Sequence, residues 1–209
     1  MVEIRDVDLG WGAPFVVAGW AVAVSLNRLG LRSPRLLGAS VVAIWLTLLL
    51  PVGEVPLHGL IRGVMGDLSV TSLVLLAAGL FSRVTGRMLL ARQGTYWIMA
   101  TALVAGGLFY PFALGVGSFD PYRLGYGAEG VGMGGTLLAL LLWLKRHRTA
   151  GFIIATAILA WGTGLLESSN LWDYLLDPWL VLASMLILGM GSMRPVRCRG
   201  TEREITAGP

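Results

Sequence analysis

The chain has 209 residues, of which 56% are apolar and only 13% are charged, and its formal net charge is +4. Several apolar runs are longer than a soluble domain of this size could bury. The basic residues form short clusters between these runs and no continuous patch, which excludes a nucleic-acid partner. The composition therefore predicts an integral membrane protein.

The order of the apolar runs predicts an all-α, polytopic transmembrane bundle of about seven spans. A helix needs roughly 20 residues to cross ~30 Å of hydrocarbon, so the shorter runs must include flanking residues. The opening stretch MVEIRDVDLGWG is acidic where a cleavable signal would be basic, so we expect the first span to stay in the mature protein. The expected segments are 13–29, 36–52, 68–82, 95–116, 131–144, 150–166 and 178–193.

Alternating connections divide the charged residues unequally between the two sides of the membrane. Three bases, Arg5, Arg62 and Arg123, fall on the side that holds most of the acids, and the other thirteen bases fall on the opposite side. Cytoplasmic loops are rich in Lys and Arg, so we expect the N-terminus outside and the C-terminus in the cytoplasm. Fifteen Arg against one Lys, with abundant Gly, Ala and Leu, indicates a bacterial inner membrane. We expect one membrane domain over 1–193 and a basic cytoplasmic tail over 194–209.

Several classes of site find no support in the sequence. Cys198 is the only cysteine, and no His/Cys pair has zinc-ligand spacing, so we expect neither a metal nor a cofactor. Lys145, the only lysine, lies at the end of the fifth span, where it cannot hold retinal. The glycines of 125–130 fit G-x-G-x-x-G, but no strand precedes them, so a dinucleotide site is not expected.

The first outer connection contains HGLIRGVMGDLS, residues 58–69. On a helix, His58 and Arg62 share one face with glycines, while the opposite face is apolar, which predicts a short interfacial helix over 56–67 between spans two and three. Two interpretations of its charges remain. His58 and Arg62 bind an anion such as a lipid phosphate, or Arg62 only extends to the interface and Asp67 is the N-cap of the third span.

The second outer connection contains an acid, a base and several glycines. Asp120 precedes a proline and predicts a turn, and Arg123 is a candidate second cation or a partner for an outer acid. Further along, Gly130 and Gly134 are one helical turn apart, so we expect the fifth span to pack closely there against a neighbouring helix.

The third outer connection leads into the last span. Asp177 followed by Pro178 predicts an N-cap and first helical residue. Asp173 has no evident structural role, and a pair with Arg62 or Arg123 would draw the three outer connections into one polar cap.

Three hypotheses for function follow. The leading one is a small multi-pass inner-membrane protein without catalysis of its own, an accessory or binding subunit that contacts membrane lipids and, through its glycine-rich faces, a membrane-protein partner or a second copy. The alternative is an enzyme that acts on a lipid or lipid-linked substrate at the outer leaflet, with His58 and Asp67 as catalytic candidates. A transporter of a neutral or lipidic solute is third, because no span has an ionisable group near its middle. The candidate binding residues are Arg62, Asp120, Arg123 and Asp173.

Overall fold

The computed structural model describes residues 12–31, 33–126 and 128–191, and within these residues the chain is predominantly helical. The only β structure in these ranges is a short antiparallel hairpin, β1 (Pro51–Val52) and β2 (Val55–Pro56). The expected basic tail over 194–209, with Cys198, lies outside the described residues.

Each of the seven apolar segments contains one long helix, and a short helix follows the hairpin where the interfacial helix was expected. The elements in chain order are α1 (Ala13–Arg28), α2 (Pro34–Leu48), α3 (Leu57–Met65), α4 (Val70–Thr85), α5 (Arg92–Ala113), the 3₁₀ helix η3 (Tyr122–Gly125), α6 (Ala128–Leu144), α7 (Arg148–Gly162), α8 (Leu171–Leu175) and α9 (Pro178–Gly189).

Local sequence sets several of these helix ends. Prolines stand in the first turns of α1, α2 and α9, where the missing amide hydrogen has no helical partner to lose. Gly86 ends α4 in the left-handed conformation, which glycine adopts without the steric cost of a side chain. The expected N-cap at Asp177 is confirmed, because its side chain accepts a hydrogen bond from the amide of Leu180.

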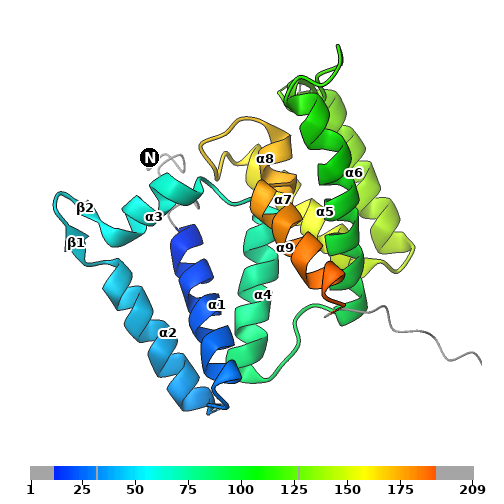
Figure 1. Cartoon of the computed structure of the whole chain (residues 1–209). Coiled ribbons are helices and arrows are strands. Elements are labelled where there is room, and N and C mark those ends of the chain that lie inside the picture. The colour runs from blue at the N-terminus through cyan, green and yellow to red at the C-terminus, as the bar shows by residue number, and fades with distance from the viewer. Residues whose placement is uncertain (1–11, 32, 127, 192–209) are drawn as a thin grey trace, which may run out of the picture.

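Three small clusters of buried side chains hold the helices together. The first joins α1, α2 and α4, the second joins α4, α7 and α8, and the third joins α5 and α9. Because α4 contributes to the first and second clusters, it connects the α1–α2 pair with the rest of the molecule (Figure 1). α6 packs along α7.

The connections alternate between two ends of the molecule (Figure 1). We call the end that carries the connections 49–69, 114–126 and 163–177 the polar end, and the end that carries 29–33, 86–91 and 145–147 the basic end. In the described ranges every acidic residue lies at the polar end. The bases described at the basic end are Arg28, Arg35, Arg83, Arg87, Arg92, Lys145, Arg146 and Arg148.

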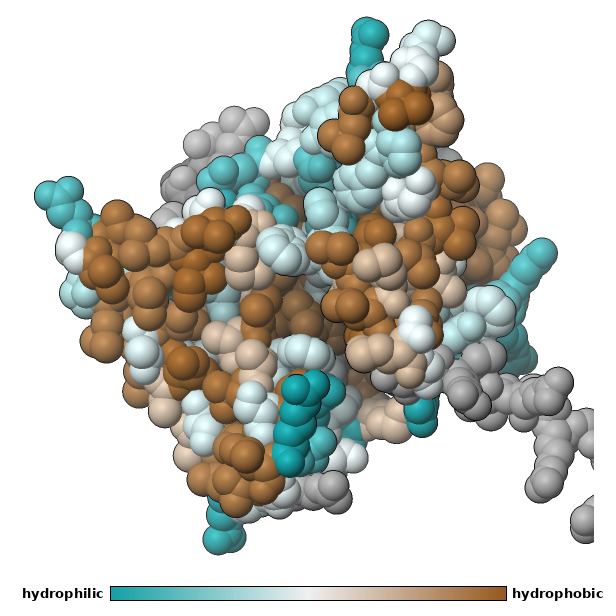
Figure 2. Space-filling view, viewed as in Figure 1, coloured by the Kyte–Doolittle hydropathy of each residue, from teal (hydrophilic) through white to brown (hydrophobic). Residues whose placement is uncertain are grey.

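Much of the surface along the helices is apolar. In Figure 2 brown residues cover most of the visible sides, and teal residues lie mainly toward the ends. Two stretches of the described residues, Arg92–Ala113 and Leu171–Gly189, are long and apolar enough to cross a membrane. The second is not one continuous helix, since Leu176 and Asp177 interrupt it between α8 and α9.

Glycines bring α6 and α7 into close contact, although they are not the expected ones. Within the described residues, a Cβ at Gly130 or Gly134 would meet nothing within 4 Å, so the predicted packing of these two glycines does not occur inside the chain. The close approach instead uses two other glycines. Gly135 of α6 faces Ile158 of α7. Gly151 of α7 faces the backbone of α6, and a Cβ at Gly151 would lie 2.8 Å from the carbonyl oxygen of Ala139. The glycine pattern predicted tight packing on α6 but assigned it to the wrong face.

Gly151→Ala is expected to lower the free energy of unfolding by about 1 to 3 kcal/mol, because the obstacle is backbone and cannot rotate away. Thermal unfolding in one detergent measures the loss. Gly134→Ala is the matched control, since it adds the same methyl group to a helix position with open space. Equal melting temperatures for the two variants would contradict the proposed close approach.

Candidate functional site

The polar end contains a buried carboxylate that joins two helices. Asp177 is only 4% exposed. Its Oδ1 accepts a hydrogen bond of 2.7 Å from the amide of Leu180, and its Oδ2 accepts from the amide of Ser69 at 2.9 Å and from the hydroxyl of Ser72 at 2.5 Å. The carboxylate therefore lies at the N-termini of both α9 and α4, where helix dipoles favour negative charge.

Ser69, and not Asp67, is the N-cap of α4. Its hydroxyl accepts a hydrogen bond of 3.1 Å from the amide of Ser72, one turn into the helix. The prediction that Asp67 caps this helix is wrong, because α4 begins at Val70 and Asp67 lies two residues before the N-cap position. The stretch DLS offers two capping side chains, and only the position of the first helical turn distinguishes them.

Asp67 instead forms an ion pair with Arg62 of α3. The Nε of Arg62 lies 2.8 Å from Oδ1 of Asp67, and its Nη2 lies 3.2 Å from Oδ2. The same Nη2 lies 3.0 Å from Oε1 of Glu167, in the connection before α8. The Arg62 side chain is only 12% exposed, so this cation is already neutralised by two carboxylates and offers little to a lipid phosphate.

Asp173 also has a structural partner, although it is neither of the expected arginines. Its Oδ2 accepts hydrogen bonds from the hydroxyl of Tyr122, at 2.8 Å, and from that of Ser168. Burial, followed by this contact with Asp173, raises the pKa of the Tyr122 hydroxyl well above its usual range. Tyr122 therefore stays protonated at neutral pH and continues to donate.

Asn170 joins the connection 163–177 to the connection 114–126 at the polar end. Its Nδ2 donates to the carbonyl of Tyr122 at 2.9 Å, and its Oδ1 caps α8 by accepting from the amide of Trp172. The indole of Trp172 donates to the carbonyl of Pro121 at 3.1 Å. A Cβ at Gly125 would overlap the Asn170 amide, so glycine is required where the two connections touch.

The three connections thus form one polar cap, which we define as Arg62, Asp67, Ser69, Ser72, Tyr122, Glu167, Ser168, Asn170, Asp173 and Asp177. The indole of Trp179 adds a further tie, a 2.9 Å hydrogen bond to the carbonyl of Met65 at the end of α3. The sequence offered such a cap as the consequence of a pair between Asp173 and Arg62 or Arg123, but the pairs that join the connections are different.

Three predicted site residues make no hydrogen bond or ion pair to the charged groups of the cap among the interactions described here: His58, Asp120 and Arg123. Nδ1 of His58 is 3.1 Å from the carbonyl of Leu48, and its ring packs on Phe15 with centroids 5.2 Å apart. Asp120 accepts a 2.9 Å hydrogen bond from the amide of Tyr122 and so stabilises its own turn. Arg123 is exposed on η3. His58 therefore contacts α1 and the end of α2, and it does not line the pocket of the polar cap.

A pocket of about 540 Å³ opens in the polar cap. It contains four carboxylates and a serine but no histidine, and among the described residues no group of three His, Cys, Asp or Glu could hold a metal ion. The serine hydroxyl donates to Asp173, and the lining holds no histidine, the general base that usually activates a serine nucleophile. Its lining is Asp67, Tyr110, Leu166, Glu167, Ser168, Asp173, Leu176, Asp177 and Pro178.

The sequence reasoning missed Tyr122, Glu167, Ser168 and Asn170. One signal was available, because Asn170 followed three residues later by Asp173 resembles the start of a capped helix. No local pattern could have paired Tyr122 with Asp173, since 51 residues separate them.

Comparison with known proteins finds no matching family model, no matching curated protein and no matching solved structure. The function must therefore be argued from the arrangement of this chain's own residues.

Asp177→Ala is expected to lower the free energy of unfolding by about 3 kcal/mol or more, because three donors from two helices lose their acceptor. Equilibrium unfolding in detergent measures the change. Asp120→Ala is the control: its carboxylate accepts a hydrogen bond from an amide of its own turn, so we expect a loss below about 1 kcal/mol. A loss for Asp177→Ala no larger than that of the control would show that the carboxylate does not join α4 to α9.

Double-mutant cycles should rank the ion pairs that Arg62 forms with Asp67 and Glu167. We expect a coupling energy of about 1 to 2 kcal/mol between Arg62→Gln and Asp67→Asn, whose contact is bidentate and largely shielded from solvent. The cycle with Glu167→Gln should give less than about 0.5 kcal/mol, because the Glu167 side chain is 73% exposed. The reverse order would show that Glu167 is the principal partner.

Proposed function

We propose that this chain is a multi-pass protein of the bacterial inner membrane, with about seven spans and the polar end outside. It acts without catalysis of its own, as an accessory or binding subunit that meets its partner at the polar cap. The accessory role rests on one observation: the charged and hydroxyl groups of the polar cap form hydrogen bonds and ion pairs with one another.

The exposed apolar surface supports the membrane assignment. Only 17% of the apolar window in Arg92–Ala113 and 33% of that in Leu171–Gly189 are buried, whereas a core helix of a soluble protein would be mostly buried. Exposed apolar residues also occur in the shorter helices, among them Leu46, Leu137 and Leu159 at 61%, 58% and 70%. Helices of 15 to 17 residues reach only about 22 to 26 Å, so their spans must include residues of the adjoining connections.

The unequal ends support the orientation. All described acids lie at one end, and eight bases without a described acid lie at the other. Loops rich in Lys and Arg remain in the cytoplasm, so the basic end faces inward and the polar cap faces outward.

The bonding within the cap favours binding over catalysis. Arg62 pairs with two carboxylates, Asp177 holds two helix N-termini, and Asp173 accepts from two hydroxyls. Groups fixed in this way give a rigid surface. Exposed side chains beside it, Phe119 at 59% and Tyr126 at 56%, supply the aromatic area that protein interfaces favour.

Intact cells and purified complexes together test the proposal. Cysteines introduced at Gly10 and Ala128 should react with a membrane-impermeant thiol reagent while native Cys198 stays protected. In the same membranes, Tyr126→Ala and Phe119→Ala should reduce by at least tenfold the recovery of one stoichiometric partner, with the melting temperature of the chain unchanged.

Val52→Ala, at an exposed apolar position of the hairpin, is the matched control and should keep the partner. Labelling of Cys198 without labelling at position 10 would invert the orientation. Turnover of a lipid-linked substrate by the purified chain alone in vesicles would replace the accessory role by an enzymatic one.

A further inference from the structure

We propose that the groove between α6 and α7, together with the basic turn Lys145–Arg148 at its end, binds an anionic phospholipid. The lipid's acyl chain lies in the groove and its phosphate lies at the turn. This inference rests on the proposed membrane location and adds a ligand class and a second site at the opposite end from the polar cap.

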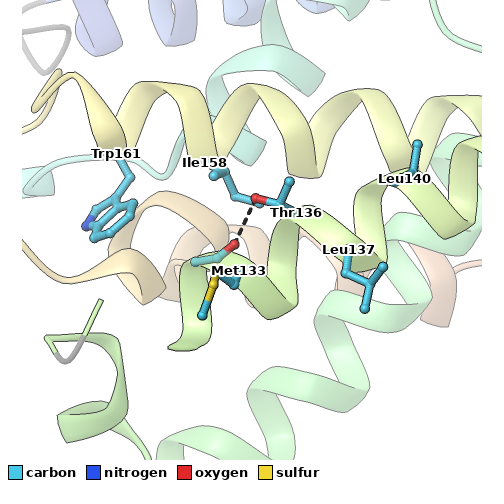
Figure 3. Close-up of a pocket in the computed structure, with 7 residues that line it drawn as sticks. Met133, Thr136, Leu137, Leu140, Ile158 and Trp161 are labelled. Atoms are coloured by element: carbon cyan, nitrogen blue, oxygen red, sulfur yellow. Dashed lines mark hydrogen bonds between the residues drawn. The ribbon is translucent and has the colours of Figure 1, made fainter. Parts of the chain in front are cut away.

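The groove is apolar and has a volume of about 570 Å³. It is lined by Gly132, Met133, Thr136, Leu137 and Leu140 of α6 and by Ile158 and Trp161 of α7 (Figure 3). Met133 is 69% exposed and Leu137 is 58% exposed, so nothing in the described chain covers this face.

The polar atoms of the lining are already satisfied. The hydroxyl of Thr136 donates to the carbonyl of Gly132 at 2.8 Å, a bond drawn in Figure 3, and the indole of Trp161 donates to the carbonyl of Ser169 at 2.9 Å. A polar ligand would therefore find no free side-chain donor in the lining, whereas a hydrocarbon chain would find continuous apolar contact.

Measured along the helices from the turn, the groove extends about as far as the thickness of one lipid leaflet. Leu140 precedes Lys145 by five residues and Gly132 precedes it by thirteen, which places the lining about 7 to 20 Å from the turn at ~1.5 Å per residue. Half of a ~30 Å hydrocarbon layer is about 15 Å. An acyl chain that begins at the turn would therefore run along the groove.

The turn supplies positive charge that nothing in the described chain neutralises. Lys145, Arg146 and Arg148 are exposed, and the described residues place no carboxylate within ion-pair distance of them. Half-exposed Trp143 precedes them at a position where tryptophan commonly meets lipid head groups. This combination of charge and aromatic contact matches a phosphate at a membrane surface.

The backbone of the turn gives an independent indication. Arg146 has φ 67°, and every other described residue with a left-handed φ is a glycine: Gly30, Gly53, Gly66, Gly86, Gly115, Gly117, Gly164 and Gly191. An L-residue in this conformation costs roughly 1 kcal/mol relative to glycine. Arg146 is thus the one described non-glycine residue in the left-handed conformation, and its backbone is strained. Such strain commonly occurs at functional positions, which supports a binding role for its guanidinium group.

The test measures lipid retention in nanodiscs of phosphatidylcholine with phosphatidylglycerol as the anionic lipid. Native mass spectrometry after release into mild detergent should show phosphatidylglycerol retained in preference to phosphatidylcholine. Arg146→Gly should lower this preference about fivefold while leaving the melting temperature equal or higher, because glycine relieves the strain but removes one charge. A further Lys145→Gln should bring the reduction to roughly 30-fold.

Two variants separate a local site from general attraction to the basic end. Arg35→Gln removes an exposed charge from the first turn of α2 at the same end and should change the preference less than twofold. Met133→Trp should fill the groove and lower lipid retention, with the charges of the turn and the melting temperature unchanged.

Several results would overturn the inference. These are equal retention of the two lipids, an equal effect of Arg35→Gln and Arg146→Gly, displacement of the lipid by millimolar inorganic phosphate, or a dimer whose interface is the α6–α7 groove. A chain that fails to enter the discs overturns the membrane assignment as well, whereas entry without lipid preference overturns only the lipid site.

Discussion

The carboxylate of Asp177 is the contact on which the polar end depends. It accepts hydrogen bonds at the starts of α4 and α9, 108 residues apart in the chain, and it is almost completely buried. Burying a charge is costly unless donors surround it, and here the donors are the amides that each helix start leaves unpaired. The same interaction therefore satisfies the carboxylate, caps both helices and sets their relative position.

The two ends of the molecule use their charges in different ways. At the polar end, carboxylates, one arginine and several hydroxyls bond to one another, and Trp172 and Trp179 add hydrogen bonds to backbone carbonyls. At the basic end no described carboxylate lies within ion-pair distance of Lys145, Arg146 or Arg148. The first arrangement stabilises the fold, and the second leaves positive charge for an external anion. For this reason we propose a protein partner at one end and a lipid at the other.

The polar cap also explains why chemistry-bearing residues need not be catalytic. His58 lies against Phe15 and the end of α2, and the pocket of the cap contains no histidine. Ser168 bonds to a carboxylate, which by itself is a weak base for a hydroxyl. Residue types alone left a lipid-modifying enzyme as the alternative to an accessory subunit, and the place of His58 outside the pocket supports the proposed binding surface.

The sequence by itself determined the features that depend on short-range patterns. Apolar runs located the long helices, prolines located several helix starts, and Asp177 followed by Pro178 located the N-cap of α9. The amphipathic pattern around Arg62 located α3. Each of these follows from periodicity or from one turn of backbone, and neighbouring residues suffice to specify it.

Only the tertiary structure decided which polar groups meet. Asp67 and Ser69 are both of a residue type that commonly caps helices. In the fold, Asp67 forms an ion pair with Arg62, which also contacts Glu167, and Ser69 is the N-cap of α4. The glycines of α6 were visible in the sequence, but the rotation of α6 against α7 selected Gly135 over Gly134 for contact. Such choices depend on residues distant in the chain, whose separation in sequence carries no information about their distance in space.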